Sequence, residues 1–263
     1  MFIGKGNFLD TYLYQLQPIE LPKNEFWADP FLLTFKNIEY VFFENYSYKK
    51  KKGKISCGKI ENNNITEVVD VLECDYHLSY PFIFEEDNEL FMIPETLQNK
   101  RVEIFKCVDF PTKWELFSTA FENEPIVDTN YYKDDLNQRW LFLNKGYGND
   151  RCSELYIYKI DSLKMNIIQE HQQNPVIIDA RIARNADPIY TYNNKLIRPS
   201  QNNSNGIYGY GLNINEIKKL TLDEYSEECL ITVEPNFKKN LISTHHLCQS
   251  QHTFVIDGAF KRK

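Results

Sequence analysis

The feature that most constrains the fold is a short motif that returns along the chain. Residues 27–33 read WADPFLL and residues 185–191 read NADPIYT, so an Asp-Pro pair opens an apolar segment twice. Related segments begin roughly every 50 to 60 residues, a period typical of propellers and solenoids. The five segments are ADPFLL, SYPFIF, VDTNYY, ADPIYT and THHLCQ, anchored at Asp29, Tyr80, Asp128, Asp187 and His245.

Each of the first four anchors is followed by a polar turn and a second apolar segment, as in TFKNIEYVFFE and EEDNELFMIPE. Further short segments, such as GKISCGKI and ELYIYKI, alternate with period two and are rich in β-branched and aromatic residues, which is typical of strands. Five such meanders predict an all-β, five-bladed β-propeller that occupies residues 1–263 as a single domain. A β-sandwich is the main alternative, and residues 214–228 are the best helix candidate, unless they form a strand and a turn.

Composition excludes several classes of function. The 263 residues carry a net charge of −7, so the chain lacks the basic surface that binds nucleic acids. Only 10 glycines are present, and no dinucleotide or P-loop motif occurs. The six cysteines have no zinc-type spacing and are expected to be free thiols. The sequence therefore predicts neither a nucleic-acid-binding protein nor a P-loop or dinucleotide enzyme.

The sequence also gives an expectation about location. No segment approaches the roughly 20 apolar residues that span a bilayer. The start, MFIGKGNFLDTYLYQ, lacks the apolar stretch and the cleavage site of a signal peptide. We therefore expect a cytoplasmic protein without a transmembrane segment.

The propeller fold predicts that the five anchors lie close together. The first strand of each blade lines the central channel, so the residues that open these strands converge at one end of the axis. Asp29, Asp128 and Asp187 are then expected to share a funnel with Tyr80 and His245. Carboxylates in one shielded site have pKa values that are pushed apart, which provides an acid and a base at neutral pH. The alternative is structural, because Asp before Pro also initiates turns and caps strand ends.

The ordered series ADPFL, YVFFE, HLSYPF, MIPE, VDT, HQQNPV, RPSQ and IDG, from about Trp27 to Gly258, resembles a known module. It is similar to the N-terminal β-propeller of plant glucosamine inositolphosphorylceramide transferases, whose bacterial relatives are associated with surface-polysaccharide biosynthesis. That module is similar in turn to the five-bladed propellers of family-43 glycoside hydrolases. In those hydrolases a first-blade Asp is the base or nucleophile, and a third-blade Asp tunes the site. The resemblance implies these roles for Asp29 and Asp128.

The proton donor departs from the hydrolase pattern, in which a Glu farther along the chain protonates the leaving group. Blade four offers Asp187, Arg198 and Gln201 but no Glu. The nearest acids are Glu95 in MIPET and Glu44 in VFFEN, where burial after an apolar run would raise the pKa. Pairing with an arginine is their alternative role. Ordinary hydrolysis is therefore less favoured than glycosyl transfer.

Other side chains are candidates for contacts with a substrate. Three arginines near the blade-four anchor are expected to hold the phosphate of a sugar donor, or else to form salt bridges. Three aromatic side chains suit stacking on a sugar and are equally typical of a core. His245 and His246 are adjacent, so only one of them can point inward from a strand. The candidate binding residues are Trp27, Glu44, His77, Tyr80, Arg181, Arg184, Arg198, Gln201, Tyr208 and His245.

The sequence thus predicts a glycosyltransferase of surface-polysaccharide or glycolipid biosynthesis that uses an activated sugar donor and a glycan acceptor. We expect Asp29 or Glu95 to act as the base, while Asp128 and Asp187 stabilise positive charge at the anomeric carbon. One alternative is a family-43-like glycoside hydrolase with Glu95 as the acid. Another is a non-catalytic glycan-binding module that assists a partner enzyme. No cofactor and no metal-binding residue is assigned.

Overall fold

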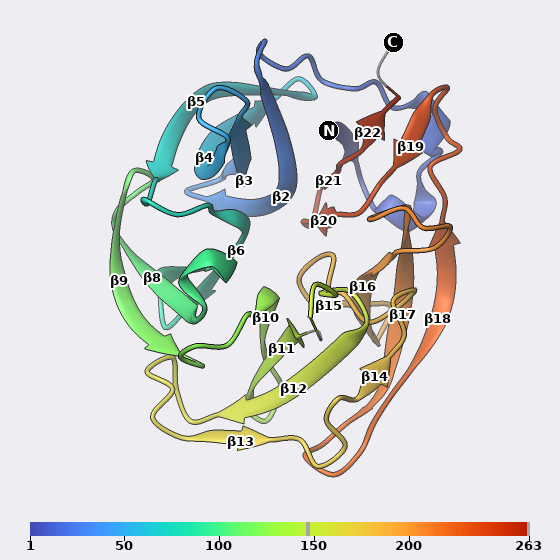
Figure 1. Cartoon of the computed structure of the whole chain (residues 1–263). Helices are drawn as coiled ribbons and strands as arrows, with labels where there is room; N and C mark the ends of the chain where they lie inside the picture. Colours follow the sequence, from blue (N-terminus) through green and yellow to red (C-terminus); the bar gives the residue numbers. More distant parts are fainter. Residues whose placement is uncertain (146–147, 262–263) are drawn as a thin grey trace.

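Antiparallel strands are arranged as five blades around a common axis in the computed structural model, which describes residues 1–145 and 148–261 (Figure 1). The predicted all-β, five-bladed propeller is confirmed. Within each of the first four blades the strands follow chain order from the axis outward, as in the order β2-β3-β4-β5. The alternating apolar residues on successive strands pack between neighbouring blades, which explains why short strands suffice.

The first two blades have four strands each. Blade one consists of β2 (Glu25–Phe35), β3 (Ile38–Ser47), β4 (Lys52–Glu61) and β5 (Asn64–Leu72). Blade two consists of β6 (Ser79–Glu86), β7 (Glu89–Glu95), β8 (Val102–Asp109) and β9 (Lys113–Ala120).

The next two blades have the same meander. Blade three consists of β10 (Val127–Lys133), β11 (Arg139–Lys145), β12 (Glu154–Ile160) and β13 (Ile168–Glu170), with β14 (Ile177–Ile178) also paired to β12. Blade four consists of β15 (Tyr190–Tyr192), β16 (Lys195–Asn202), β17 (Gly211–Leu220) and β18 (Tyr225–Val233). The helix considered for residues 214–228 is therefore wrong. The segment is a strand, a turn and a strand, because β17 pairs with neighbours on both sides.

The last blade joins the two ends of the chain. It consists of β20 (Leu247–Gln249), β21 (Thr253–Ile256) and the N-terminal strand β1 (Phe2–Lys5), flanked by the pair β19 (Leu241–Ser243) and β22 (Ala259–Phe260). Phe2 pairs with Ile256, and the Phe2 and Phe254 side chains are fully buried. The N-terminal strand thus closes the ring (Figure 1).

Helical structure is confined to short 3-10 turns within the described residues. These are η1 (Phe8–Asp10), η2 (Leu13–Gln15) and η3 (Leu97–Asn99). No helix in residues 1–145 and 148–261 has the length and apolar character needed to cross a membrane. All six cysteines are free.

Three anchors occupy the same backbone position in successive blades. Asp29, Tyr80 and Asp128 have φ values of 49°, 44° and 47°. Each lies where the register between the first and second strand shifts, as between Ala28 and Phe31 in blade one. A left-handed backbone is unfavourable for residues other than glycine, and a β-bulge redirects the side chain it carries. In blades one to three the sequence repeat therefore corresponds to a repeated bulge.

Candidate active site

A chain of buried ionisable groups joins blade one to blade five through His245. Its Nδ1 lies 2.8 Å from Asp257 Oδ2, and its Nε2 lies 3.4 Å from Asp29 Oδ1. Both ring nitrogens can donate to these carboxylates only when the imidazole is doubly protonated. Burial alone would lower the pKa of His245, but the carboxylates of Asp257 and Asp29 outweigh it and raise the pKa to about 9.

The same three groups have the spacing of a small cation site, since their ligand atoms lie within 4.8 Å of one another. The imidazolium of His245 already supplies positive charge between the two carboxylates, and each of its ring nitrogens lies within ion-pair distance of one of them. We therefore describe Asp29, His245 and Asp257 as an ion-paired chain and assign no metal to it.

Asp29 is a buried carboxyl group whose pKa lies near neutrality. Its side chain is almost completely buried, and its Oδ2 accepts a hydrogen bond from the backbone N–H of Tyr80 at 3.2 Å. Burial raises the pKa of Asp29 to about 7, with the charges of Asp128 and Asp257 acting in the same direction and that of His245 opposing them. A carboxyl group with this pKa takes up and releases protons near neutral pH.

A second buried group is centred on Arg184. Its Nε lies 2.5 Å from Asp128 Oδ2, and its Nη2 lies 3.4 Å from Glu95 Oε2. Gln201 Nε2 donates to the same Asp128 oxygen at 3.3 Å, and the ring of Tyr208 lies 5.0 Å from the guanidinium carbon. Burial and the neighbouring Asp128 raise the pKa of Glu95 well above its usual range, so Glu95 can carry a proton at neutral pH.

Glu44 and His77 extend the carboxylate region along blade one. His77 Nδ1 accepts a hydrogen bond from Gly53 N at 2.9 Å, and its Nε2 lies 3.5 Å from Glu44 Oε1. Burial lowers the pKa of His77, which is therefore neutral. Burial raises the pKa of Glu44 well above its usual range, and the nearby Asp29 adds to this effect.

Two predicted residues, Tyr80 and Asp187, have side chains that are buried in the interior. The Tyr80 side chain is fully buried, and its hydroxyl donates to Asn130 Oδ1 at 2.7 Å. Asn130 Nδ2 donates in turn to the carbonyl of Asp187. Burial raises the pKa of Asp187 well above its usual range, and its carboxyl neighbours the thiol of Cys248. These contacts connect blades two, three and four along the axis, as a structural role requires.

Only one of the three predicted arginines reaches the carboxylates. Arg198 is fully buried and is bound by Glu227, with Nε and Nη2 each at 2.7 Å from a carboxylate oxygen. The Arg181 side chain is 70% exposed and pairs with Asp179 at 2.6 Å. Arg184 is already balanced by its two acidic partners. The salt-bridge alternative is thus the arrangement found for all three arginines.

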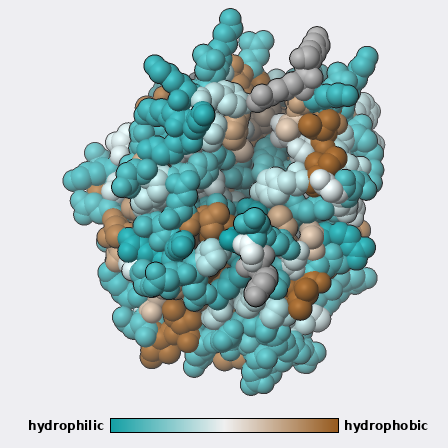
Figure 2. Space-filling view, viewed as in Figure 1, coloured by the Kyte–Doolittle hydropathy of each residue, from teal (hydrophilic) through white to brown (hydrophobic). Residues whose placement is uncertain are grey.

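The two remaining aromatic candidates, Tyr208 and Trp27, differ in exposure. Tyr208 is 52% exposed, and its ring lies 5.5 Å from the ring of His245. Trp27 is 9% exposed and packs against Phe43 with ring centroids 4.5 Å apart. Tyr208 is therefore the aromatic side chain that a ligand can reach beside the carboxylates. The face seen in Figure 2 is mainly hydrophilic, with small separated apolar patches.

Asp257 is the residue that sequence reasoning missed. It ends the apolar run FVID, just as Glu44 ends VFFE, Glu95 ends MIPE and Gln201 ends RPSQ. Glu44 and Glu95 each pair with the residue before an anchor, and the backbone N–H of Asp257 donates to the carbonyl of His246 at 3.0 Å. A polar residue at the end of the second strand thus recurs with nearly the anchor period, and this signal could have identified Asp257.

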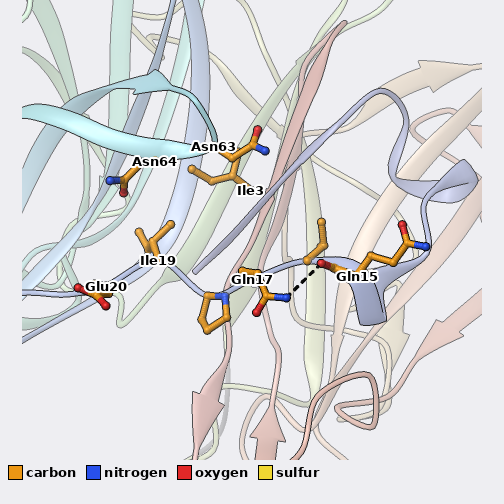
Figure 3. A pocket seen from close by; sticks show the side chains of 9 residues that line it. Ile3, Gln15, Gln17, Ile19, Glu20, Asn63 and Asn64 are labelled. Atoms are coloured by element: carbon orange, nitrogen blue, oxygen red, sulfur yellow. Dashed lines mark hydrogen bonds between the residues drawn. The ribbon is translucent and has the colours of Figure 1, made fainter.

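A surface pocket of about 390 Å³ lies apart from both groups (Figure 3). The N-terminal segment, with Gln15, Gln17 and Glu20, forms one part of its wall, and Asn63 and Asn64 of the β4–β5 turn form another. Its lining contains none of the charged residues of the candidate active site.

Comparison with known proteins identifies relatives over most of the chain. The profile of a family described as glucosamine inositolphosphorylceramide transferase 1, N-terminal, matches residues 16–252. The chain is 32% identical over 212 residues to glucosamine inositolphosphorylceramide transferase 1 of Oryza sativa subsp. japonica, covering 78% of this chain and 28% of the relative. It is 30% identical over 254 residues to the protein of that name from Arabidopsis thaliana, covering 90% and 32%. The chain thus spans about a third or less of the length of these relatives.

Solved structures share the fold at low sequence identity. The catalytic domain of a GH62 α-L-arabinofuranosidase from Coprinopsis cinerea has a TM-score of 0.66 at 11% identity, covering 92% of this chain and 86% of that one. A xylan β-1,4-xylosidase from Bacillus halodurans C-125 has a TM-score of 0.62 at 9% identity, covering 94% and 52%. A thermostable family-43 glycoside hydrolase has a TM-score of 0.57 at 8% identity, covering 79% and 76%. These similarities show the fold alone. The family match and the curated relatives together show that this chain belongs to the family of the N-terminal domain of glucosamine inositolphosphorylceramide transferases.

Proposed function

We propose that this chain acts in glycosyl transfer during assembly of a surface polysaccharide or glycolipid, with Asp29 as the base toward an acceptor hydroxyl. The observation that carries the proposal is the position of Asp29 between the His245 imidazolium and the backbone N–H of Tyr80. A buried carboxylate with a pKa of about 7 is ionised in part at neutral pH and is basic enough to take a hydroxyl proton. The names of the curated relatives, which are transferases, support the same class of reaction.

The charge balance of the site indicates which part of the reaction it serves. The ionisable groups of the site are Asp29, Glu44, Glu95, Asp128 and Asp257, with Arg184 and His245 as cations. Arg184 and His245 are both paired with carboxyl groups, so neither cation is free for a phosphate, and the site suits hydroxyl groups or an ammonium group. We therefore assign to this site the sugar that is transferred, together with the attacking acceptor hydroxyl, and place the phosphate of the donor outside it. The amino sugar named in the relatives, glucosamine, has the ammonium group that such a site attracts.

The second group of residues completes the proposed sugar site. Asp128, held by Arg184 and Gln201, presents negative charge toward the anomeric centre. Tyr208, with its exposed ring beside Arg184, provides a surface on which the apolar face of a sugar can stack. A partner enzyme, or the remainder of a longer chain, would supply the donor.

Binding and transfer can be tested separately. Glucosamine, N-acetylglucosamine, glucose and myo-inositol are titrated against the purified chain and followed by thermal unfolding and calorimetry. A ligand at about 1,000 times its Kd stabilises the folded state by about 4 kcal/mol. We expect glucosamine to bind more tightly than its N-acetyl form. Asp29→Asn should keep this binding and lose transfer from a nucleotide-activated glucosamine. Failure of all four ligands to bind, or full transfer by the variant, would refute the proposal.

A glycoside hydrolase is the second candidate, because the raised pKa of Glu95 suits a general acid. Release of nitrophenol from nitrophenyl glycosides, abolished in Glu95→Gln, would favour hydrolysis over transfer. Sugar binding without either reaction would favour the glycan-binding module.

A further inference from the structure

Asp257 contacts two anchors, His245 of blade five and Asp29 of blade one. Its Oδ1 accepts hydrogen bonds from the backbone N–H groups of His245 and His246, both at 3.0 Å. Its Oδ2 lies 2.8 Å from His245 Nδ1 and 3.5 Å from the backbone N–H of Asp29. One buried carboxylate therefore holds the blade-five anchor by both main chain and side chain, and also touches the blade-one anchor.

We propose that Asp257 is a positioning residue of this site, which fixes the orientation and the positive charge of His245 and thereby keeps Asp29 available as a base. The inference rests on the proposed function. Asp257 itself does not touch the acceptor, since it lies behind His245 and is 2% exposed.

The surroundings of His245 show why the Asp257 contact matters. The groups that face the ring are the carboxylates of Asp29 and Asp257 and the ring of Tyr208, while Asp128 acts from farther away. The adjacent His246 is fully buried, and burial lowers its pKa to about 3, so it is neutral. Of two neighbouring histidines, only the one bound through its ring by Asp257 carries a charge.

The charge on His245 controls the state of Asp29. Burial and two nearby carboxylates all raise the pKa of Asp29, and His245 is the first of the groups that oppose them. Without the imidazolium, Asp29 would remain protonated at neutral pH and could not accept a proton. When Asp29 takes the proton of the acceptor hydroxyl, the acceptor oxygen forms the new bond to the anomeric carbon. The leaving group departs with the electron pair of the broken bond, and His245 keeps both of its protons.

The test measures protonation without any substrate. The pKa of His245 is determined by NMR of ¹⁵N-histidine-labelled protein, and that of Asp29 by ¹³C-carboxyl titration, in the wild type and in Asp257→Asn. In the wild type we expect His245 to titrate at about 9. In the variant its pKa should fall to about 6.5 or below, and that of Asp29 should rise above about 7. Asp179→Asn, which removes an exposed partner of Arg181, is the matched control and should change neither value.

An unchanged His245 pKa in folded Asp257→Asn would overturn the inference. If that variant does not fold, His245→Gln provides the second measurement, and an unchanged Asp29 pKa in it would also overturn the inference. In the transfer assay, Asp257→Asn should lower kcat by about 100-fold. It should leave KM nearly unchanged and shift the acidic limb of the pH profile, which reports ionisation of Asp29, to higher pH. A purely structural defect would not move this limb. Absence of transfer in the wild type would refute the proposed function, whereas the NMR titration decides the role of Asp257 independently.

Discussion

Arg184→Gln should destabilise the protein far more than the same substitution at Arg181 in the same loop. Arg184 is buried and lies 2.5 Å from Asp128 and 3.4 Å from Glu95, whose side chains are also buried. Arg181 makes a comparably short contact with Asp179, but 70% of its side chain is exposed. The two substitutions therefore remove the same charge from a dry and from a wet environment.

The expected losses of unfolding free energy follow from the difference in burial between Arg184 and Arg181. Loss of one member of a buried ion pair leaves uncompensated charge and costs about 3–5 kcal/mol. Loss of an exposed pair costs about 0–1 kcal/mol. The two variants should therefore differ by at least about 2 kcal/mol in the free energy of unfolding, measured by urea denaturation.

The pH dependence provides an independent check. The folded-state pKa of Glu95 already lies above its unfolded value, so the folded protein binds more protons there and stability falls as pH rises. Arg184 opposes this shift at Glu95 and at Asp29. Its removal should therefore cost more at pH 8 than at pH 5, where the carboxyls can become protonated. Equal losses for Arg184→Gln and Arg181→Gln, or a loss that is greater at pH 5, would refute the reasoning.

Further predictions concern the base, its neighbour and the closure of the ring. The rate of transfer should rise with pH through about 7, because only ionised Asp29 accepts a proton, and a flat profile from pH 5 to 8 would exclude that role. Asp29→Asn should keep or raise the thermal midpoint at pH 8, measured by circular dichroism, because the fold opposes ionisation of this carboxyl above its unfolded pKa. Gly209→Ala places a methyl carbon 2.4 Å from His245 Cβ, whereas Gly206→Ala meets nothing within 4 Å at a similar positive φ. Both variants should lose about 1 kcal/mol to the backbone, and only Gly209→Ala should move the NMR signals of His245. Phe2→Ala should cost about 3–5 kcal/mol in urea unfolding, since Phe2 is fully buried in the closing strand, and a loss below about 1 kcal/mol would contradict that role.

The repeat made the five-bladed fold predictable from the sequence. The pairing of the N-terminal strand with the last blade, which closes the ring, was not predictable. Anchors about 50 residues apart and alternating apolar segments are local signals, so they indicate both the number of blades and their first strands. The short strand Phe2–Lys5 has no such periodicity, and its partner Thr253–Ile256 lies at the other end of the chain. Pairing of this kind is determined by tertiary context, which a local pattern does not contain.

The sequence located the acids of the site better than it located the arginines. Asp29 and Asp128 were indicated by the repeat of the anchor motif, and Glu95 by its position after an apolar run. The expectation that several arginines hold a phosphate was chemically reasonable. However, whether a guanidinium is free depends on which acids fold against it. Glu227, which binds Arg198, comes from the outer strand β18, and nothing near Arg198 in the sequence indicates that contact.

Two sets of residues at equivalent blade positions explain why the candidate proton donor, Glu95, lies in blade two. The anchors form one ring, and the residues that end the second strands form another, which comprises Glu44, Glu95, Asn144, Gln201 and Asp257. In blade four the second ring supplies the neutral Gln201, and the preceding loop supplies Arg184; both contact Asp128. Asp128 is therefore engaged as an ion-pair partner of Arg184 and as a hydrogen-bond acceptor from Gln201. Glu95 in blade two, buried, within reach of Arg184 and with a raised pKa, is the carboxyl group that can hold a proton beside Asp128. We therefore predict that Glu95 takes the role of the Glu that blade four lacks. Loss of transfer in Glu95→Gln with retained sugar binding would support this prediction, and full transfer would contradict it.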